Sequence, residues 1–216
     1  MSRELLERLL DGQSLERSEA RGLLEAMMDG QLGPEMASAL LTALRMNGES
    51  SEELLGFVEV LRDRCSPVSV AAGPDLIDTC GTGGDNSGSF NISTATAFVA
   101  AGMGLRVAKH GNRSVSSRCG SADVLEALGV DIGLSPEGIA RCIEECGIGF
   151  LYAPSLHPAM ARIAPVRRAL GIRTCFNMLG PLVNPAGARR QLIGCFSLTA
   201  ARRMAAVLAG LGTGQA

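Results

Sequence analysis

The sequence predicts an α/β protein with a small N-terminal helical bundle, residues 1–70, followed by a mainly parallel α/β domain, residues 71–216. Two patterns lead to this prediction. Up to residue 65, the apolar residues recur at helical spacing. From residue 76 onward, short strand-like runs alternate with helical segments, which is typical of a parallel sheet covered by helices.

The helical bundle is divided into short helices by residues that start or end helices. Asp29-Gly30 and Asn47-Gly48 mark helix ends, and Gly33-Pro34 places a proline in a first helical turn. Ser50 followed by Glu53 predicts a capping box at the start of a fourth helix. We interpret this region mainly as a packing module.

The α/β domain follows from the same signals, taken in chain order. Strands are expected where β-forming runs are bounded by glycines, and helices where capping residues precede apolar periodicity. The chain ends after a helix, where the alternation calls for another strand, so we expect the domain to be incomplete at its C-terminal end. The expected strands are 76–79, 105–108, 148–152 and 191–196, and the expected helices are 93–101, 122–128, 136–147, 158–170 and 199–211.

Composition excludes several classes of function. The formal net charge is −2 and there are six Phe, one Tyr and no Trp, so neither a basic nucleic-acid surface nor a base-stacking platform is expected. No apolar run approaches the ~18 residues of a membrane span, and no export signal is evident. Seven scattered cysteines without C-x-x-C spacing predict buried thiols in a reducing compartment. We therefore expect a cytoplasmic protein with no nucleic-acid or membrane partner.

A glycine-rich segment joins the first expected strand to the next helix. Residues 78–94 read Asp-Thr-Cys-Gly-Thr-Gly-Gly-Asp-Asn-Ser-Gly-Ser-Phe-Asn-Ile-Ser-Thr. Glycines let backbone N–H groups approach an anion, and the helix start adds further donors and the positive end of the helix dipole. The spacing fits neither a P-loop nor a dinucleotide loop. Because Asp85 would repel a bare anion but can bind hydroxyl groups, a phosphorylated ribose is the ligand we expect.

A second polar run follows the next expected strand. Residues 109–117, Lys-His-Gly-Asn-Arg-Ser-Val-Ser-Ser, combine cations, an amide and hydroxyl groups, and predict a flexible clamp for a diphosphate. Farther along lie Arg167-Arg168 and then a proline-braced turn at 177–185, which could wall off an aromatic substrate. Taken singly, each of these two features is better explained as structural.

These segments together resemble the anthranilate phosphoribosyltransferase family of tryptophan biosynthesis. Residues 78–85, 109–128, 157–166 and 174–185 carry the resemblance, which extends over the whole chain. It implies an α/β fold of the nucleoside phosphorylase/phosphoribosyltransferase type. It also implies transfer of phosphoribose from 5-phosphoribosyl-1-diphosphate (PRPP) to anthranilate with release of diphosphate, the second step from chorismate, with Mg²⁺ as cofactor. A homodimer formed through the N-terminal helices is implied as well.

The resemblance assigns roles to residues by matching motif. Lys109, Asn112 and Arg167 would be catalytic, and Ser93 would bind magnesium. The anthranilate site would consist of Gly81, Asn112, His157, Arg167 and Gly180. The PRPP site would consist of Gly81, Thr82, Gly84, Asp85, Ser89, Asn91, Ser93, Thr94, Lys109, His110, Gly111, Asn112, Arg113, Ser114, Val115, Ser116, Ser117 and Ser121.

One part of the family pattern has no match in this chain. An Asp-Glu pair would hold magnesium together with the Ser93 hydroxyl, but this sequence contains no Asp-Glu dipeptide. Magnesium should then bind weakly except through the diphosphate of the substrate, and the 216-residue chain is expected to have impaired activity or none.

Two other functions stay open at this point. A pyrimidine nucleoside phosphorylase-like enzyme would share the architecture and the phosphate-binding glycine loop, although the run at 109–117 argues against it. A non-catalytic paralogue that binds a ligand or nucleic acid is the second alternative, and Asn112 and Arg167 argue against that interpretation.

Overall fold

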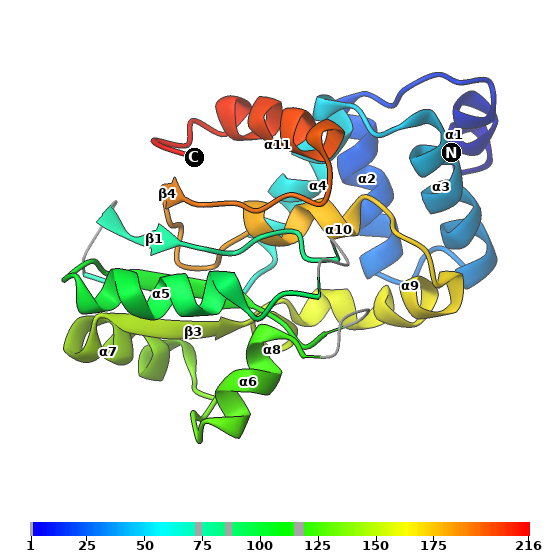
Figure 1. The fold of residues 1–216 in the computed structure, drawn as a ribbon. Helices are drawn as coiled ribbons and strands as arrows, with labels where there is room; N and C mark the ends of the chain where they lie inside the picture. The colour runs from blue at the N-terminus through cyan, green and yellow to red at the C-terminus, as the bar shows by residue number, and fades with distance from the viewer. Residues whose placement is uncertain (1, 72–74, 85–87, 115–118) are drawn as a thin grey trace.

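The structure, a computed structural model, describes residues 2–71, 75–84, 88–114 and 119–216 (Figure 1). A helical N-terminal part adjoins an α/β part built on one parallel sheet, which confirms the predicted fold class. Among the described residues, every helix falls short of the length and apolar character that crossing a bilayer requires.

The N-terminal part contains four helices in which α2 packs along α4 and α1 packs along α3. Gly56 allows the close approach of α2 and α4, because a Cβ atom at Gly56 would lie 2.5 Å from the Arg17 carbonyl oxygen. The predicted capping box is confirmed: the Ser50 amide donates to Glu53 Oε2 at 2.7 Å, and the Glu53 amide donates to Ser50 Oγ at 3.2 Å. The helices are α1 (Ser2–Leu10), α2 (Arg17–Met28), α3 (Pro34–Asn47) and α4 (Ser51–Asp63).

The sheet has the strand order β3-β2-β1-β4, and all its strand pairs are parallel. Ile77 pairs with Val107 on one side and with Arg190 on the other, and Val107 pairs with Ile148. Arg190 also forms a parallel bridge with Gln215, beyond the β4 edge. The strands are β1 (Ile77–Asp78), β2 (Val107–Gly111), β3 (Ile148–Tyr152) and β4 (Arg190–Gln191).

Helices cover both faces of the sheet, as the alternation of side chains along β3 shows. Leu151 packs with α7, whereas Phe150 and Tyr152 pack against the α6 region. Successive residues of a strand point to opposite faces, so α6 and α7 lie on opposite sides. In Figure 1, α5 lies in front of the sheet and α7 behind it. These helices are α5 (Ile92–Gly102), α6 (Ser121–Ala127), α7 (Pro136–Cys146) and the short α8 (Ala153–Leu156).

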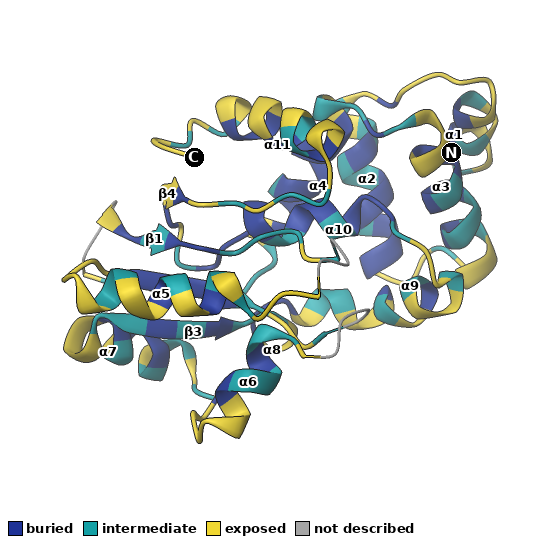
Figure 2. Cartoon of the chain, in the orientation of Figure 1, coloured by how far each residue is buried: buried dark blue, intermediate teal, exposed yellow. Residues whose placement is uncertain are grey.

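The largest apolar core joins the N-terminal helices to helices from the end of the chain. Leu40, Leu54 and Phe57 share one buried cluster with Phe176 and Met204. Figure 2 shows that most of α4 and α10 is buried. Arg203 Nη1 also pairs with the buried Glu49 at 3.1 Å, which ties α11 to the turn before α4. The C-terminal elements are a 3₁₀ helix (Pro158–Arg162), α9 (Ala164–Leu170), α10 (Phe176–Leu179), a second 3₁₀ helix (Gly180–Leu182) and α11 (Leu198–Gly210).

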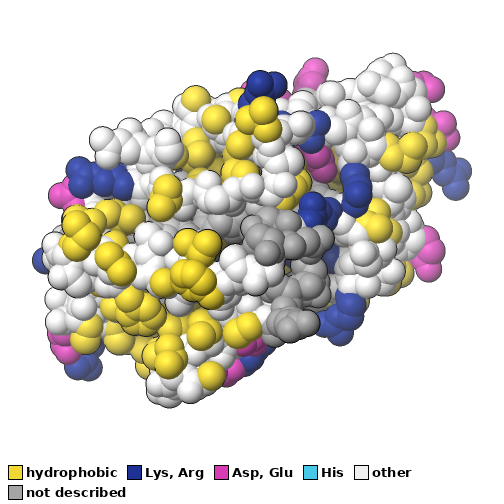
Figure 3. All heavy atoms as spheres, viewed as in Figure 1, with side chains coloured by type: hydrophobic (Ala, Val, Ile, Leu, Met, Phe, Trp, Pro, Cys, Tyr) yellow, Lys and Arg dark blue, Asp and Glu magenta, His cyan; other side chains and the backbone are white. Residues whose placement is uncertain are grey.

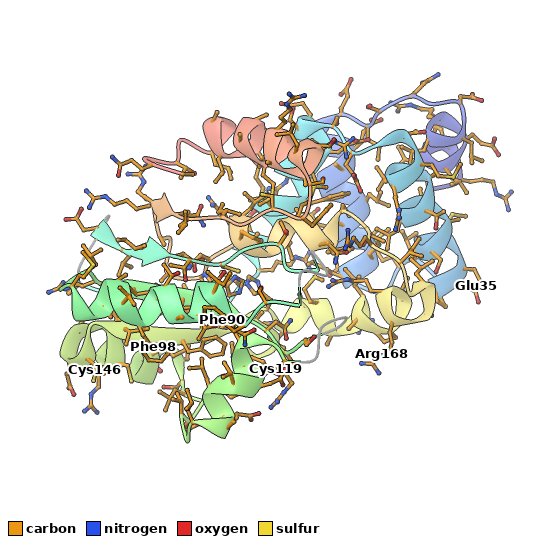
Figure 4. The ribbon with its side chains drawn as sticks, in the orientation of Figure 1. Glu35, Phe90, Phe98, Cys119, Cys146 and Arg168 are labelled. Atoms are coloured by element: carbon orange, nitrogen blue, oxygen red, sulfur yellow. The ribbon has the colours of Figure 1, made fainter. Side chains whose placement is uncertain are left out.

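The outer face of α5 and its flanking residues is apolar and exposed. Phe90, Val99 and Met103 are 73%, 63% and 75% exposed, respectively, and Phe98 is 44% exposed. Figure 3 shows hydrophobic side chains gathered over this part of the molecule, and Figure 4 labels Phe90 and Phe98 within it.

Some predicted elements differ in the structure. The predicted helix 158–170 divides at Ile163, because Pro165 lacks the N–H that a continuous helix would use. The predicted strand 105–108 is wrong at both ends, since β2 spans Val107–Gly111. The predicted strand 191–196 shortens to Arg190–Gln191. The sequence did not predict α8 or α10.

The prediction of buried thiols holds for only one of the seven cysteines. None of the seven forms a disulfide, and Cys175 alone is buried, while Cys119 and Cys146, labelled in Figure 4, are exposed. The lack of C-x-x-C spacing carries no information about burial: Cys146 ends an amphipathic helix on its solvent side, and Cys119 lies in a loop.

Candidate functional site

The predicted phosphate-binding segments begin at the carboxyl ends of two neighbouring strands. β1 ends at Asp78 and β2 ends at Gly111, and the two strands are parallel. Their carboxyl ends therefore lie at one edge of the sheet, where open parallel sheets commonly bind ligands. The structure thus brings the glycine-rich loop and the start of the second polar run together.

The glycine-rich loop needs glycine at three described positions. At Gly81, a Cβ atom would lie 2.8 Å from the Gly194 carbonyl oxygen, so the two backbones can approach only without a side chain. Gly83 and Gly84 have φ values of +63° and +67°, which other residues rarely adopt. The Thr82 amide donates to the Gly194 carbonyl at 2.9 Å, which holds the loop against residues 194–196.

The polar residues between the loop and α5 lie at or near the start of that helix. Asn91 Nδ2 donates to the Gly120 carbonyl at 3.0 Å, and Thr79 Oγ1 donates to the Ser93 carbonyl at 2.8 Å. Ser93 and Thr94 are in the first turn of α5, where Thr94 is buried. Ser89 precedes the helix in an exposed segment, and Asp85 lies outside the described residues.

The buried carboxylate of Asp78 joins these segments by hydrogen bonds. Its Oδ1 accepts from the Cys80 amide at 2.9 Å and from the His110 amide at 3.1 Å, and its Oδ2 accepts from Asn184 Nδ2 at 2.8 Å. Burial raises the pKa of Asp78 to about 6, although the hydrogen bond from Asn184 lowers it. Sequence reasoning gave Asp78 and Asn184 no role. The signal that could have identified Asp78 is its position as a carboxylate at the end of an apolar strand.

Lys109, His110 and Gly111 belong to β2 itself, which corrects the prediction that they form part of a flexible clamp. Lys109 is 3% exposed and His110 is 2% exposed, because β2 lies between β1 and β3 within the sheet. Gly111 approaches α6 so closely that a Cβ atom there would lie 2.3 Å from Ser121 Oγ. The polar run therefore starts inside the sheet, and the described loop residues are 112–114 and 119–120.

The loop residues after β2 turn toward α6. Ser121 Oγ donates to the Asn112 carbonyl at 3.2 Å, and the Ser114 amide donates to Asp123 Oδ2 at 3.1 Å. The Arg113 guanidinium pairs with Asp123 at 3.1 Å and also with Glu126, so this cation is already neutralised locally. Val115, Ser116 and Ser117 lie outside the described residues.

Two neutral imidazoles lie beside the strand ends. His110 Nδ1 donates to the Gly180 carbonyl at 2.9 Å, and the ring centroids of His110 and His157 are 5.2 Å apart. Burial lowers the pKa of His110 to about 3 and that of His157 to about 4. His110 Nε2 and both ring nitrogens of His157 are buried and lack a partner at hydrogen-bonding geometry among the described residues, although the Val183 backbone lies close enough to His157 to oppose the effect of burial on its pKa. Such unsatisfied atoms are the kind that a polar ligand would satisfy.

The residues assigned to anthranilate are only partly brought together. His110 links His157 and Gly180, as described above. Arg167 lies on α9 with its guanidinium 5.1 Å from the centroid of Phe176, and burial lowers its pKa. No hydrogen bond, ion pair or ring contact between described residues joins Arg167 to His157, Gly180 or Asn112.

The described residues do not by themselves form a magnesium site. Their one cluster of three possible metal ligands is Asp78, Cys80 and His110, whose ligand atoms lie within 4.8 Å of one another. Thiol and imidazole groups are poor ligands for magnesium, which prefers oxygen. The Asp78 carboxylate already accepts three hydrogen bonds. Ser93 supplies a hydroxyl group at the start of α5, but no carboxylate cluster accompanies it in the described part of the chain.

Two family models match nearly all of the chain. Residues 3–65 match the helical bundle domain of a glycosyl transferase family, and residues 73–216 match the a/b domain of that family. Over all 216 residues, the chain is 55% identical to anthranilate phosphoribosyltransferase of Rubrobacter xylanophilus, of which it covers 63%. It is 53% identical to the enzyme of Anaeromyxobacter dehalogenans, of which it covers 64%.

Solved structures give the same result. The anthranilate phosphoribosyltransferase of Thermus thermophilus matches with a TM-score of 0.90 at 47% identity, covering 97% of this chain and 63% of that one. The Saccharomyces cerevisiae enzyme in complex with PRPP and Mg matches with a TM-score of 0.87 at 27% identity, covering 99% of this chain and 64% of that one. The chain thus spans slightly less than two thirds of the length of these relatives.

Proposed function

Because the chain belongs to the glycosyl transferase family that has a helical bundle domain and an α/β domain, we propose that the whole protein is an anthranilate phosphoribosyltransferase. It would transfer phosphoribose from PRPP to the amine of anthranilate and release diphosphate. The observation that carries this proposal is the meeting of the glycine loop with Lys109 and the two histidines at one sheet edge, in a chain 55% identical to such an enzyme.

The residues at this edge suit the two substrates of the reaction. The backbone amides of Gly83 and Gly84 and the ammonium group of Lys109 would bind the phosphate groups of PRPP. The yeast relative was solved with PRPP and Mg, and another structure of that enzyme holds 4-fluoroanthranilate. Since the residues present do not complete a magnesium site, we expect magnesium to enter with the diphosphate of the substrate.

The chemical step would depend on placement more than on proton transfer. The aromatic amine of anthranilate is a neutral nucleophile, so no strong base is needed. The low pKa values of His110 and His157 keep both rings neutral at pH 7, and they can orient a polar substrate without repelling a cationic sugar carbon. The Arg167 guanidinium would pair with the carboxylate of anthranilate.

Binding measurements test this function without requiring the chain to turn over. In calorimetric titrations with Mg²⁺ present, the 216-residue chain is expected to bind PRPP and, in the presence of diphosphate, 4-fluoroanthranilate. Thymidine and uridine should not bind. Binding of either nucleoside with no binding of 4-fluoroanthranilate would instead favour a pyrimidine nucleoside phosphorylase, and the proposal would be abandoned.

We further propose that the protein forms a homodimer through α1 and α3. An open hollow of about 360 Å³ between these helices is lined mainly by apolar residues, including Leu6, Leu10 and Ala43. Met46 and Leu10 at this hollow are 80% and 63% exposed. Large exposed apolar side chains beside a hollow are typical of association surfaces.

Met46→Asp is expected to shift the protein from dimer to monomer, because a buried unpaired carboxylate in an interface costs roughly 2–5 kcal/mol. Sedimentation velocity over a range of concentrations measures the shift. Met103→Asp is the matched control, since Met103 is 75% exposed but lies at the end of α5. A wild-type protein that stays monomeric at high concentration, or equal effects of the two substitutions, would rule out this interface.

A further inference from the structure

Arg173 lies in the connection between α9 and α10 and reaches the glycine-rich loop. Its Nη2 donates to the Gly84 carbonyl, and the carbon of its guanidinium lies 4.7 Å from the centroid of the Phe196 ring. In Figure 1 this connection runs between the helical bundle and the loop after β1. Neither the glycine motif nor the polar run contains Arg173, which is 89 residues from Gly84.

Residues 194–196 hold the other side of the same loop. The Thr82 amide donates to the Gly194 carbonyl at 2.9 Å, and the Phe196 amide donates to Thr82 Oγ1 at 3.0 Å. Phe196 therefore contacts both Thr82, through its amide, and Arg173, through its ring. The loop from Thr82 to Gly84 is enclosed by these contacts at both ends.

The backbone of Arg173 is itself fixed. Its carbonyl accepts a hydrogen bond from Arg45 Nη1 in the last turn of α3. The next residue, Thr174, donates its amide to Asn177 Oδ1 at 3.0 Å. Arg173 thus connects the helical bundle to the glycine-rich loop from a defined turn.

A glycine loop needs such support because glycine is conformationally free. Gly83 and Gly84 both have positive φ values, and glycine loses more entropy than any other residue when it is held in one conformation. A carbonyl that rotated toward a phosphate would repel it. A donor that binds the Gly84 carbonyl fixes the direction of this group, and the guanidinium charge adds a positive potential next to the loop.

We propose that Arg173 is a positioning residue that holds the phosphate-binding loop in its anion-binding conformation. The identity of the anion, PRPP, rests on the proposed function, whereas the support of the loop does not. Arginine suits this role because its planar guanidinium can stack on Phe196 while it donates to Gly84. A lysine has the charge but lacks the planar group.

Titration calorimetry with PRPP and Mg²⁺ tests the effect on binding. Arg173→Gln is expected to weaken PRPP binding about tenfold, the size of one lost charge-assisted hydrogen bond. Arg173→Lys should recover less than half of that loss on a logarithmic scale. The control is Arg168→Gln, expected to change affinity less than about twofold, because Arg168 extends from α9 into solvent (Figure 4). Affinity for 4-fluoroanthranilate should not change in any variant.

Hydrogen exchange of the ligand-free protein tests the loop directly, whatever its ligand. In Arg173→Gln, amides of residues 79–84 should exchange about tenfold faster, while α3 and α11 keep their wild-type rates. Unchanged exchange in this variant, full recovery by Arg173→Lys, or equal losses from Arg173→Gln and Arg168→Gln would overturn the proposal. If the wild type fails to bind PRPP but the exchange rates rise as expected, the proposed function fails and the positioning role stands.

Discussion

Replacing Lys109 with Met is expected to weaken PRPP binding roughly 10- to 150-fold, the range that corresponds to a hydrogen bond from a charged donor. Lys109 is 3% exposed in β2, so its position is set by the sheet and little entropy is lost when it binds a phosphate. Methionine keeps an unbranched chain that can fill the same space, which should preserve the fold. Calorimetric titration with PRPP and Mg²⁺ gives the affinity, and circular dichroism checks folding.

Arg106→Met provides the matched control, since Arg106 immediately precedes β2 but is exposed. Both substitutions remove one positive charge from the same segment. If only net charge matters, the two variants should lose affinity equally, and the specific role of Lys109 would be refuted. We expect Arg106→Met to change affinity less than about threefold, because the charge of an exposed side chain is screened by water and salt.

Lys109 and His110 also show why the sequence misplaced the second strand. Polar residues normally end a strand, and the predicted strand therefore stopped at Ala108. In the structure β2 continues to Gly111, where it pairs with Tyr152 of β3. A strand with a neighbour on each side can carry buried polar residues when they serve a site at its carboxyl end. The polar residues Lys109 and His110 therefore did not mark the start of a loop.

Residues 192–196 show the opposite error. The run Leu-Ile-Gly-Cys-Phe looks like a strand, but only the Leu192 amide continues the pairing, by donating to the Asp78 carbonyl at 2.9 Å. Beyond it, the Gly194 carbonyl and the Phe196 amide bind Thr82 in the glycine-rich loop. The segment 192–196 lies outside β4. Its hydrogen-bond partners depend on a loop 112 residues away, which no local pattern contains.

Some features of the candidate site can be predicted from neighbouring residues in the sequence, and others depend on contacts between distant segments. The glycines at positions 83 and 84 and the helix start near Ser93 follow from local chemistry, and the structure agrees with both. The side chains that hold the glycine-rich loop in place cannot be identified from local sequence chemistry. Asp78 and Asn184 are 106 residues apart, and each looks ordinary in its own segment. Both residues are buried, and the hydrogen bond between them is what makes each important for the structure of the sheet edge.

Asp78→Asn is expected to lower the free energy of unfolding by about 3 kcal/mol, which would make Asp78 one of the most sensitive positions in the α/β part. The carboxylate accepts from two backbone amides through Oδ1 and from Asn184 through Oδ2. An asparagine has one oxygen, so its NH₂ group must face at least one of these donors. Urea unfolding followed by circular dichroism measures the loss.

Asp75→Asn is the control for charge alone. Asp75 precedes β1 and pairs with Arg190 at 3.0 Å, but its side chain is 68% exposed, so its loss should cost less than about 1 kcal/mol. Equal losses for the two variants would contradict the role given to Asp78.

The exchange Asp78→Asn with Asn184→Asp separates a specific hydrogen bond from a general need for charge at position 78. In the double variant, the introduced asparagine can accept from the backbone amides and donate to the carboxylate introduced at position 184. Recovery should be partial, because Asn184 Nδ2 also donates to the Ala108 carbonyl at 2.8 Å, and an aspartate there cannot. A coupling free energy of about 1 kcal/mol or more in the double-mutant cycle is therefore expected. Strictly additive losses would mean that the two side chains stabilise the sheet edge independently.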